Sequence, residues 1–119
     1  PTRDFNYVEA TCRGFINIAE SPATIGQIVN IGSNFEISIG DTLNIIKELM
    51  NSDVEFVIDK QRIRPKNSEV FRLWCDNSKI RKLTGFNSQV VIREGLKRTI
   101  NWVTHPNNLK HYKSEIYNV

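Results

Sequence analysis

The chain opens with the stretch PTRDFNYVE, Pro1–Glu9, and the rest of the sequence can be read outward from it. An Arg-Asp pair precedes an aromatic residue and a Tyr-Val pair. The segment that follows has apolar residues at helical spacing: Val8, Cys12, Phe15, Ile16 and Ala19. We therefore expect a helix from about Tyr7 to Glu20 that buries this face, because apolar residues three or four apart share one side of a helix. This arrangement places Arg3, a permanently charged cation, shortly before the N-terminus of the predicted helix.

Downstream of this helix, short β-branched stretches alternate with helical patterns. Strands are predicted over 27–32 and 54–58, with extended pieces at 36–39 and 70–75. Helices are predicted over 39–51, over 78–83, from Asn87 or Ser88 to the stop at His105-Pro106, and over about 107–117. This order indicates an α/β fold in a single domain, residues 1–119. Because the strands are few for a free-standing sheet, we expect a larger partner sheet to be encoded upstream.

Local signals mark several helix ends. Ser38 and Asp41 have the spacing of a capping box, and Asp76 is a suitable N-cap for the 78–83 helix. Gly85 stands where a left-handed residue ends a helix.

Composition excludes several classes of protein. The chain has 119 residues, of which 39% are hydrophobic and 24% charged, as is typical of a globular domain. The net charge of +3 is too small, without a motif, to predict nucleic-acid binding. Apolar runs are too short to span a membrane. The two cysteines, Cys12 and Cys75, lack the spacing of a metal site or disulfide framework and are consistent with a reducing cytoplasm.

Two arginines, Arg3 and Arg64, are candidates for binding an anion. A guanidinium group offers a planar fork of donors that suits phosphate, and Ile63, which precedes Arg64, can anchor its loop in a core. Pro65 restricts the loop around Arg64, and Glu69 carries a carboxylate able to accept hydrogen bonds from sugar or ribose hydroxyls. Taken singly, a solvated surface position is the more common role for each of the three residues.

Five segments in order resemble one known family. They are the opening PTRDFNYVE, then RPKNSEV at Arg64–Val70, DNSKI at Asp76–Ile80, LTGF at Leu83–Phe86 and EGLKRTINW at Glu94–Trp102. Together they are similar to extended short-chain dehydrogenase/reductases that act on nucleotide sugars. The pattern is closest to the NAD-dependent nucleotide-sugar 4,6-dehydratases, with epimerases next.

The resemblance implies specific roles. Arg3 and Arg64 would contact the diphosphate of a nucleotide sugar, and Glu69 its nucleoside. The parent would be a lyase or isomerase of polysaccharide biosynthesis, a cytoplasmic homodimer that oxidises the sugar at C4 with NAD. This chain would be its carboxyl-terminal substrate-binding lobe, with few strands, several helices and the dinucleotide-binding sheet missing.

The sequence lacks the parts that would make the chain active alone. Its six glycines form no dinucleotide-binding motif, and there is no Tyr-x-x-x-Lys pair. We therefore expect no catalytic residue, bound NAD or metal in this chain, and, because it starts at Pro1, a longer parent protein. Apolar faces meant for the missing part would be exposed.

Two other functions are open. The chain could be a complete, non-catalytic module that binds an anionic ligand or partner through residues 60–66. A basic RNA-contacting domain is a weaker alternative, because no stacking motif is present.

Overall fold

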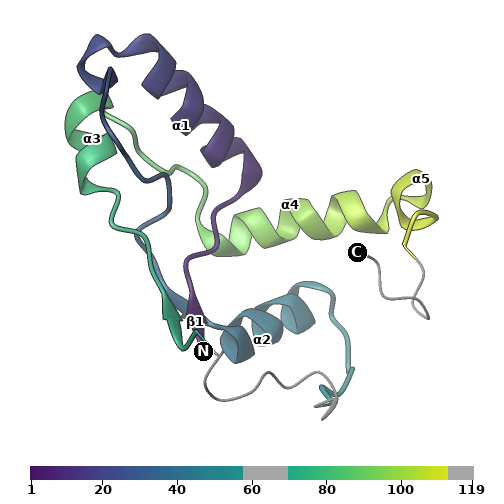
Figure 1. The fold of residues 1–119 in the computed structure, drawn as a ribbon. Helices are drawn as coiled ribbons and strands as arrows, with labels where there is room; N and C mark the ends of the chain where they lie inside the picture. The colour runs from purple at the N-terminus through teal and green to yellow at the C-terminus, as the bar shows by residue number, and fades with distance from the viewer. Residues whose placement is uncertain (58–69, 113–119) are drawn as a thin grey trace.

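The structure, a computed structural model, describes residues 1–57 and 70–112 (Figure 1). The elements in these ranges are β1 (Thr2–Arg3), α1 (Val8–Glu20), the 3-10 turn η1 (Pro22–Thr24), β2 (Ile37–Ser38), α2 (Ile39–Leu49), β3 (Arg72–Leu73), α3 (Ser78–Thr84), α4 (Ile92–Thr104) and α5 (Pro106–Leu109). Figure 1 shows two groups of helices: α1 packs beside α3, and α4 packs on α2. A small sheet lies below α1 and α3 in Figure 1, beside the start of α2.

The opening stretch supplies the centre of that sheet. The strand order is β2-β1-β3, with β1 antiparallel to β2 and parallel to β3. The ladder to β3 is held by two hydrogen bonds, from the Thr2 N–H to the Phe71 carbonyl at 2.8 Å and from the Asp4 N–H to the Leu73 carbonyl at 2.9 Å. The strand formed by the first few residues therefore pairs with two segments, 37–38 and 72–73, that are far from it in the sequence.

The helix predicted over 7–20 is present as α1, but the prediction of which face of the helix is buried is wrong. Phe15 is 62% exposed, and the other apolar residues of that face are exposed too. The residues of α1 that are buried are Ala10 and Gly14. A Cβ added at Gly14 would lie 2.7 Å from Cγ2 of Ile31, so the small side of the helix allows the chain to approach closely. Close backbone approach, rather than hydrophobic area, decides which side of α1 packs within this chain.

The two strands predicted at 27–32 and 54–58 are also wrong for the described residues. Residues 27–32 and 54–57 are not assigned to any strand, and residue 58 lies outside the described ranges. Ile28 is 87% exposed. A β-branched sequence forms a strand only against a neighbouring strand, and none of the described segments pairs with these residues.

Most of the predicted helix signals are confirmed. Ser38 Oγ accepts a hydrogen bond from the Asp41 N–H at 3.0 Å, and Gly85 has a φ of 70° at the end of α3. The Asp76 carboxylate accepts from the Ser78 N–H at 2.9 Å, although Asn77 occupies the capping position. The predicted caps of the next helix are wrong: α4 begins after Val91, without a side-chain cap.

The end of the chain differs from its prediction as well. His105 ends α4 as expected, and α5 covers only Pro106–Leu109 of the region where a longer final helix was predicted. Residues 113–119 lie outside the described ranges. No helix in the described part of the chain is long and apolar enough to cross a membrane.

The apolar core of the described residues is small. Ala10, Ile80 and Phe86 are its buried apolar side chains, joined by the buried Thr24 of η1. These residues lie where α1, η1 and α3 pack together. The second group of helices, α2 with α4 and α5, contributes half-buried rather than fully buried apolar residues.

Candidate functional site

The first candidate residue, Arg3, lies on the central strand of the sheet. Its Cα partners are Ile37 on β2 and Leu73 on β3, and the side chain is half-buried. The guanidinium Nη1 donates to the Thr2 carbonyl at 2.7 Å. A cation on a strand paired on both sides has a fixed backbone, so less conformational entropy is lost when the side chain binds an anion.

Asp4 fixes the strand end that follows Arg3. Its Oδ1 accepts from the Ser33 N–H at 3.1 Å and the Ser33 hydroxyl at 2.5 Å. Its Oδ2 accepts from the N–H groups of Asn34 at 3.0 Å and Cys75 at 3.3 Å. Asp4 thus fixes the position of neighbouring backbone. One carboxylate joins β1 to the 33–34 loop and to the exit of β3.

The chain packs unusually closely at this junction. A Cβ added at Gly32 would lie 2.4 Å from Cβ of Cys75, so only glycine fits there. Asn77, which is buried, donates from Nδ2 to the Gly32 carbonyl at 2.9 Å. The role of Asn77 was not predicted from the sequence, and its place directly after Asp76, the predicted cap, was the available signal.

Cys75 is unsuited to nucleophilic chemistry in this position. Burial raises the pKa of the Cys75 thiol, and the negative charges of Asp4 and Asp76 raise it further. Because the thiolate is the reactive form, a thiol with a raised pKa is protonated and unreactive at neutral pH.

A second polar cluster, also missed in the sequence, is centred on Glu36. Arg72 donates to both carboxylate oxygens, from Nε to Oε2 at 2.7 Å and from Nη2 to Oε1 at 2.8 Å, and Thr2 Oγ1 donates to Oε2 at 3.1 Å. The guanidinium of Arg72 also lies 4.8 Å from the ring centroid of Trp74. The hydrogen bond from Arg72 is the main cause that lowers the pKa of Glu36. Through this cluster Glu36, which directly precedes β2, is hydrogen-bonded to Thr2 on β1 and to Arg72 on β3.

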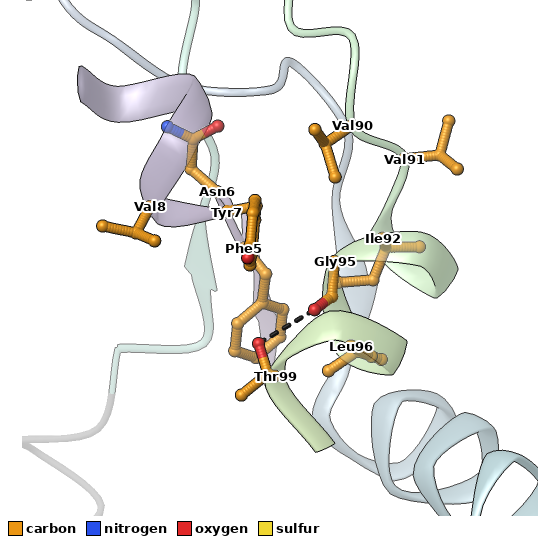
Figure 2. A pocket seen from close by; sticks show the side chains of 10 residues that line it. All are labelled: Phe5, Asn6, Tyr7, Val8, Val90, Val91, Ile92, Gly95, Leu96 and Thr99. Carbon is orange, nitrogen blue, oxygen red and sulfur yellow. Dashed lines mark hydrogen bonds between the residues drawn. The ribbon is translucent and has the colours of Figure 1, made fainter. Parts of the chain in front are cut away.

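An apolar cavity of about 410 Å³ lies between the β1–α1 connection and the start of α4 (Figure 2). Its lining residues are Phe5, Asn6, Tyr7, Val8, Val90, Val91, Ile92, Gly95, Leu96 and Thr99. Tyr7 packs on Gly95, where an added Cβ would lie 3.3 Å from the tyrosine Cβ, so a packing role for Tyr7 is supported. The Oδ1 atom of Asn6 is buried and has no hydrogen-bond partner among the described residues.

The other two predicted site residues, Arg64 and Glu69, lie outside the described residues. Their meeting with Arg3 therefore stays a prediction. The described chain resumes at Val70, and the next residue, Phe71, accepts the hydrogen bond from Thr2. Within residues 1–57 and 70–112, no group of three or more His, Cys, Asp or Glu side chains is placed to hold a metal ion.

Comparison with known proteins identifies the family. The family profile described as GDP-mannose 4,6 dehydratase matches residues 1–99, which is most of the chain. The chain belongs to the GDP-mannose 4,6-dehydratase family. Its curated relatives carry the names of both epimerases and 4,6-dehydratases of nucleotide sugars.

Three of the family relatives illustrate the likeness. A putative UDP-glucose 4-epimerase of Methanocaldococcus jannaschii is 32% identical over 106 residues, which are 89% of this chain and 32% of the relative. The epimerase Mth375 of Methanothermobacter thermautotrophicus is 33% identical, with a TM-score of 0.80 over 92% of this chain and 31% of that one. The enzyme WbmF of Bordetella bronchiseptica, solved with NAD⁺ and UDP, is 33% identical, with a TM-score of 0.70 over 93% and 30%.

These relatives are much longer than the present chain. It spans about a third of the length of the family members that it matches. The arrangement of β1, its two neighbours and the helices around them is thus one part of the structures of the relatives.

Proposed function

We propose that this chain is the nucleotide-sugar-binding portion of an NAD-dependent nucleotide-sugar 4,6-dehydratase or epimerase. The observation that carries the proposal is Arg3, held on the central strand of the sheet and braced by Asp4, in a chain that belongs to this family. WbmF, a structural relative at 33% identity, was solved with both NAD⁺ and UDP, which supports a nucleoside diphosphate as the ligand.

In this proposal the chain binds and orients the substrate. Arg3 and Arg64 neutralise the diphosphate with charge-assisted hydrogen bonds, and Glu69 accepts hydrogen bonds from the nucleoside. Asp4 holds the strand end in place and does not contact the substrate, because its two oxygens already accept hydrogen bonds from Ser33, Asn34 and Cys75. The diphosphate is then anchored away from the reacting carbons of the sugar.

The cofactor site is proposed to lie elsewhere in the whole enzyme. NAD supplies reversible oxidation at C4 of the sugar in such an enzyme. The glycines of this chain are dispersed at positions 14, 26, 32, 40, 85 and 95 and form no loop that could approach a dinucleotide, so its residues do not fit the cofactor. We further propose, from the family resemblance alone, that the whole enzyme is a cytoplasmic homodimer of polysaccharide biosynthesis and that this part is inactive by itself.

The test is the kinetics of Arg64→Ala and Arg3→Ala in the enzyme that carries this chain. Hydrogen bonds to charged groups contribute about 1.5–3 kcal/mol, so we expect KM for the nucleotide sugar to rise by roughly 10- to 150-fold, with a smaller change in kcat. Arg3→Lys should recover part of the loss, because it keeps the charge without the planar fork.

Arg93→Ala is the matched control, because Arg93 forms an exposed ion pair with Glu48 at 2.9 Å, on the α2–α4 side of the molecule. It should leave KM unchanged. An unchanged KM in both the Arg3 and Arg64 variants would remove the two guanidinium groups from the substrate site and favour the stand-alone binding module.

A further inference from the structure

The sheet that carries Arg3 has little backbone to hold its central strand. Each of the strands β1, β2 and β3 is two residues long. On the β3 side, the N–H groups of Thr2 and Asp4 donate to the carbonyls of Phe71 and Leu73. A strand this short has few ladder hydrogen bonds, and each of them contributes only a small net free energy. Backbone pairing alone therefore fixes the register of β1 weakly.

The register of β1 determines the side of the sheet to which Arg3 belongs. Successive side chains of a strand point to opposite faces, so Thr2 and Arg3 are on different faces of the sheet. Thr2 lies opposite Arg72 in the ladder to β3, and Arg3 lies in the next row of that ladder. A slip of β1 by one residue would move Arg3 to the face on which Thr2 now lies.

Glu36 joins the three strands through side chains at this point. It directly precedes β2, and it accepts hydrogen bonds from Thr2 on β1 at 3.1 Å and from Arg72 on β3 at 2.7 and 2.8 Å. We call Thr2, Glu36 and Arg72 the Glu36 clamp. After a slip by one residue, the Thr2 hydroxyl would be on the wrong face to reach Glu36. The clamp therefore stabilises the observed register against its neighbours.

The geometry of the Glu36–Arg72 pair distinguishes it from an ordinary surface ion pair. An exposed pair with a single contact contributes little, whereas a bidentate guanidinium–carboxylate pair has stronger hydrogen bonds and a defined geometry. The ring centroid of Trp74 lies 4.8 Å from the Arg72 guanidinium and supports it from one side. The hydrogen bond from Arg72 also lowers the pKa of the Glu36 carboxyl, so the carboxylate is charged at neutral pH.

A direct hydrogen bond connects the clamp to the arginine that it would position. The Arg3 Nη1 donates to the Thr2 carbonyl at 2.7 Å, so the guanidinium is bound to the residue whose hydroxyl Glu36 holds. Both Glu36 oxygens already accept hydrogen bonds within the clamp. A displacement of Thr2 would consequently displace the Arg3 guanidinium as well.

We propose that Glu36 and Arg72 are positioning residues for substrate binding, which hold β1 in the register that presents Arg3 to the diphosphate of the nucleotide sugar. The inference rests on the proposed function in taking Arg3 as a contact of the diphosphate. Glu36 and Arg72 do not themselves contact the substrate. Their effect on affinity passes through Arg3, because a guanidinium that is already in place loses less conformational entropy when the anion binds.

The experiment measures kcat and KM for the nucleotide sugar in the whole enzyme that carries this chain. Glu36→Gln and Arg72→Gln should each raise KM roughly 3- to 10-fold and leave kcat within about twofold, as expected for the loss of one coupled contact that acts on binding. Arg72→Lys should recover part of the affinity, because it keeps the charge without the planar fork. Glu48→Gln, in the exposed ion pair with Arg93, is the matched control and should change neither constant.

A combined substitution separates positioning from a general loss of structure. In the Arg3→Ala background, Glu36→Gln should not raise KM further, because the guanidinium that Glu36 positions is gone, whereas two independent effects would multiply. Hydrogen exchange gives a second readout that does not depend on substrate. The Asp4 N–H, which donates to Leu73 at 2.9 Å, should exchange at least about tenfold faster in Glu36→Gln and at an unchanged rate in Glu48→Gln.

The inference is overturned by an unchanged KM in both glutamine variants, by unchanged exchange at Asp4, or by effects that multiply in the double variant. If the glutamine variants do not fold, Arg72→Lys with and without Arg3→Ala provides the same comparison. A raised KM in Arg3→Ala with an unchanged KM in the clamp variants rejects this inference alone. An unchanged KM in Arg3→Ala rejects the proposed contact between Arg3 and the diphosphate, and this inference with it.

Discussion

At the scale of single residues, Asp4 determines how the opening stretch is held. Its carboxylate receives donors from the loop at 33–34 and from Cys75, segments that are far from it in the sequence. An acidic residue next to Arg3 would ordinarily be taken for its salt-bridge partner. In the structure Asp4 accepts hydrogen bonds from the backbone N–H groups of Ser33, Asn34 and Cys75.

Asp4→Ala is therefore expected to destabilise the fold by about 2–4 kcal/mol, because several half-buried N–H groups lose a charged acceptor at once. Chemical denaturation followed by circular dichroism measures the change. Asp53→Ala, at an exposed position, is the control and should alter stability by less than about 0.5 kcal/mol. Equal stability of the two variants would contradict a bracing role for Asp4.

Glu36 predicts a pH dependence. Arg72 lowers the pKa of the Glu36 carboxyl below its ordinary value of 4.5, so the folded state favours the charged form. The stabilisation is then complete above pH 4.5 and is lost as the pH falls through the lowered pKa of the folded protein. We expect Glu36→Gln to abolish this part of the acid transition, as measured by stability between pH 7 and pH 2. An acid transition identical to that of the unsubstituted protein would show that the pair does not contribute.

At the scale of elements, the packing of helices is decided by close approach as much as by apolar area. The Gly32–Cys75 junction brings the end of the 27–32 segment against the exit of β3, and Gly14 allows Ile31 to approach α1. Both glycines are in contacts between segments that are distant in sequence. Such contacts cannot be recognised from local sequence patterns, because the sequence does not distinguish a glycine in a loop from a glycine at which two distant segments pack closely.

Gly32→Ala should consequently be destabilising, by roughly 1–3 kcal/mol, since the added methyl group would overlap Cys75. Gly40→Ala is the matched control: it lies in the first turn of α2, and its nearest neighbour to an added Cβ is 3.8 Å away. There the same change should raise stability by about 0.5–1 kcal/mol, because alanine favours the helix. Thermal unfolding of the two variants decides the matter, and a tolerated alanine at position 32 would argue against the close contact.

At the scale of the whole molecule, the described chain consists of two helix groups and a short sheet beside them. Its Cα radius of gyration is 17.2 Å, above the value of about 13.5 Å for a compact domain of this length, and it buries few apolar side chains. On α1, the apolar residues Val8, Phe15 and Ile16 are exposed. The expectation that apolar faces would be left uncovered came from the family resemblance, whereas the identity of the face emerged only from the packing of Gly14 and Ala10.

The local sequence by itself determined the helices and several of their ends, because periodicity, the Ser38 cap and the left-handed Gly85 act within a few residues of the chain. The ordered motifs were also sufficient to indicate the family, which the profile match confirms. Tertiary structure decided which side of α1 packs, that residues 27–32 form no strand within the described chain, and that Asp4, Asn77 and Glu36 join distant segments. These outcomes depend on which groups meet in space, and strand pairing in particular requires a second edge that the local pattern does not specify.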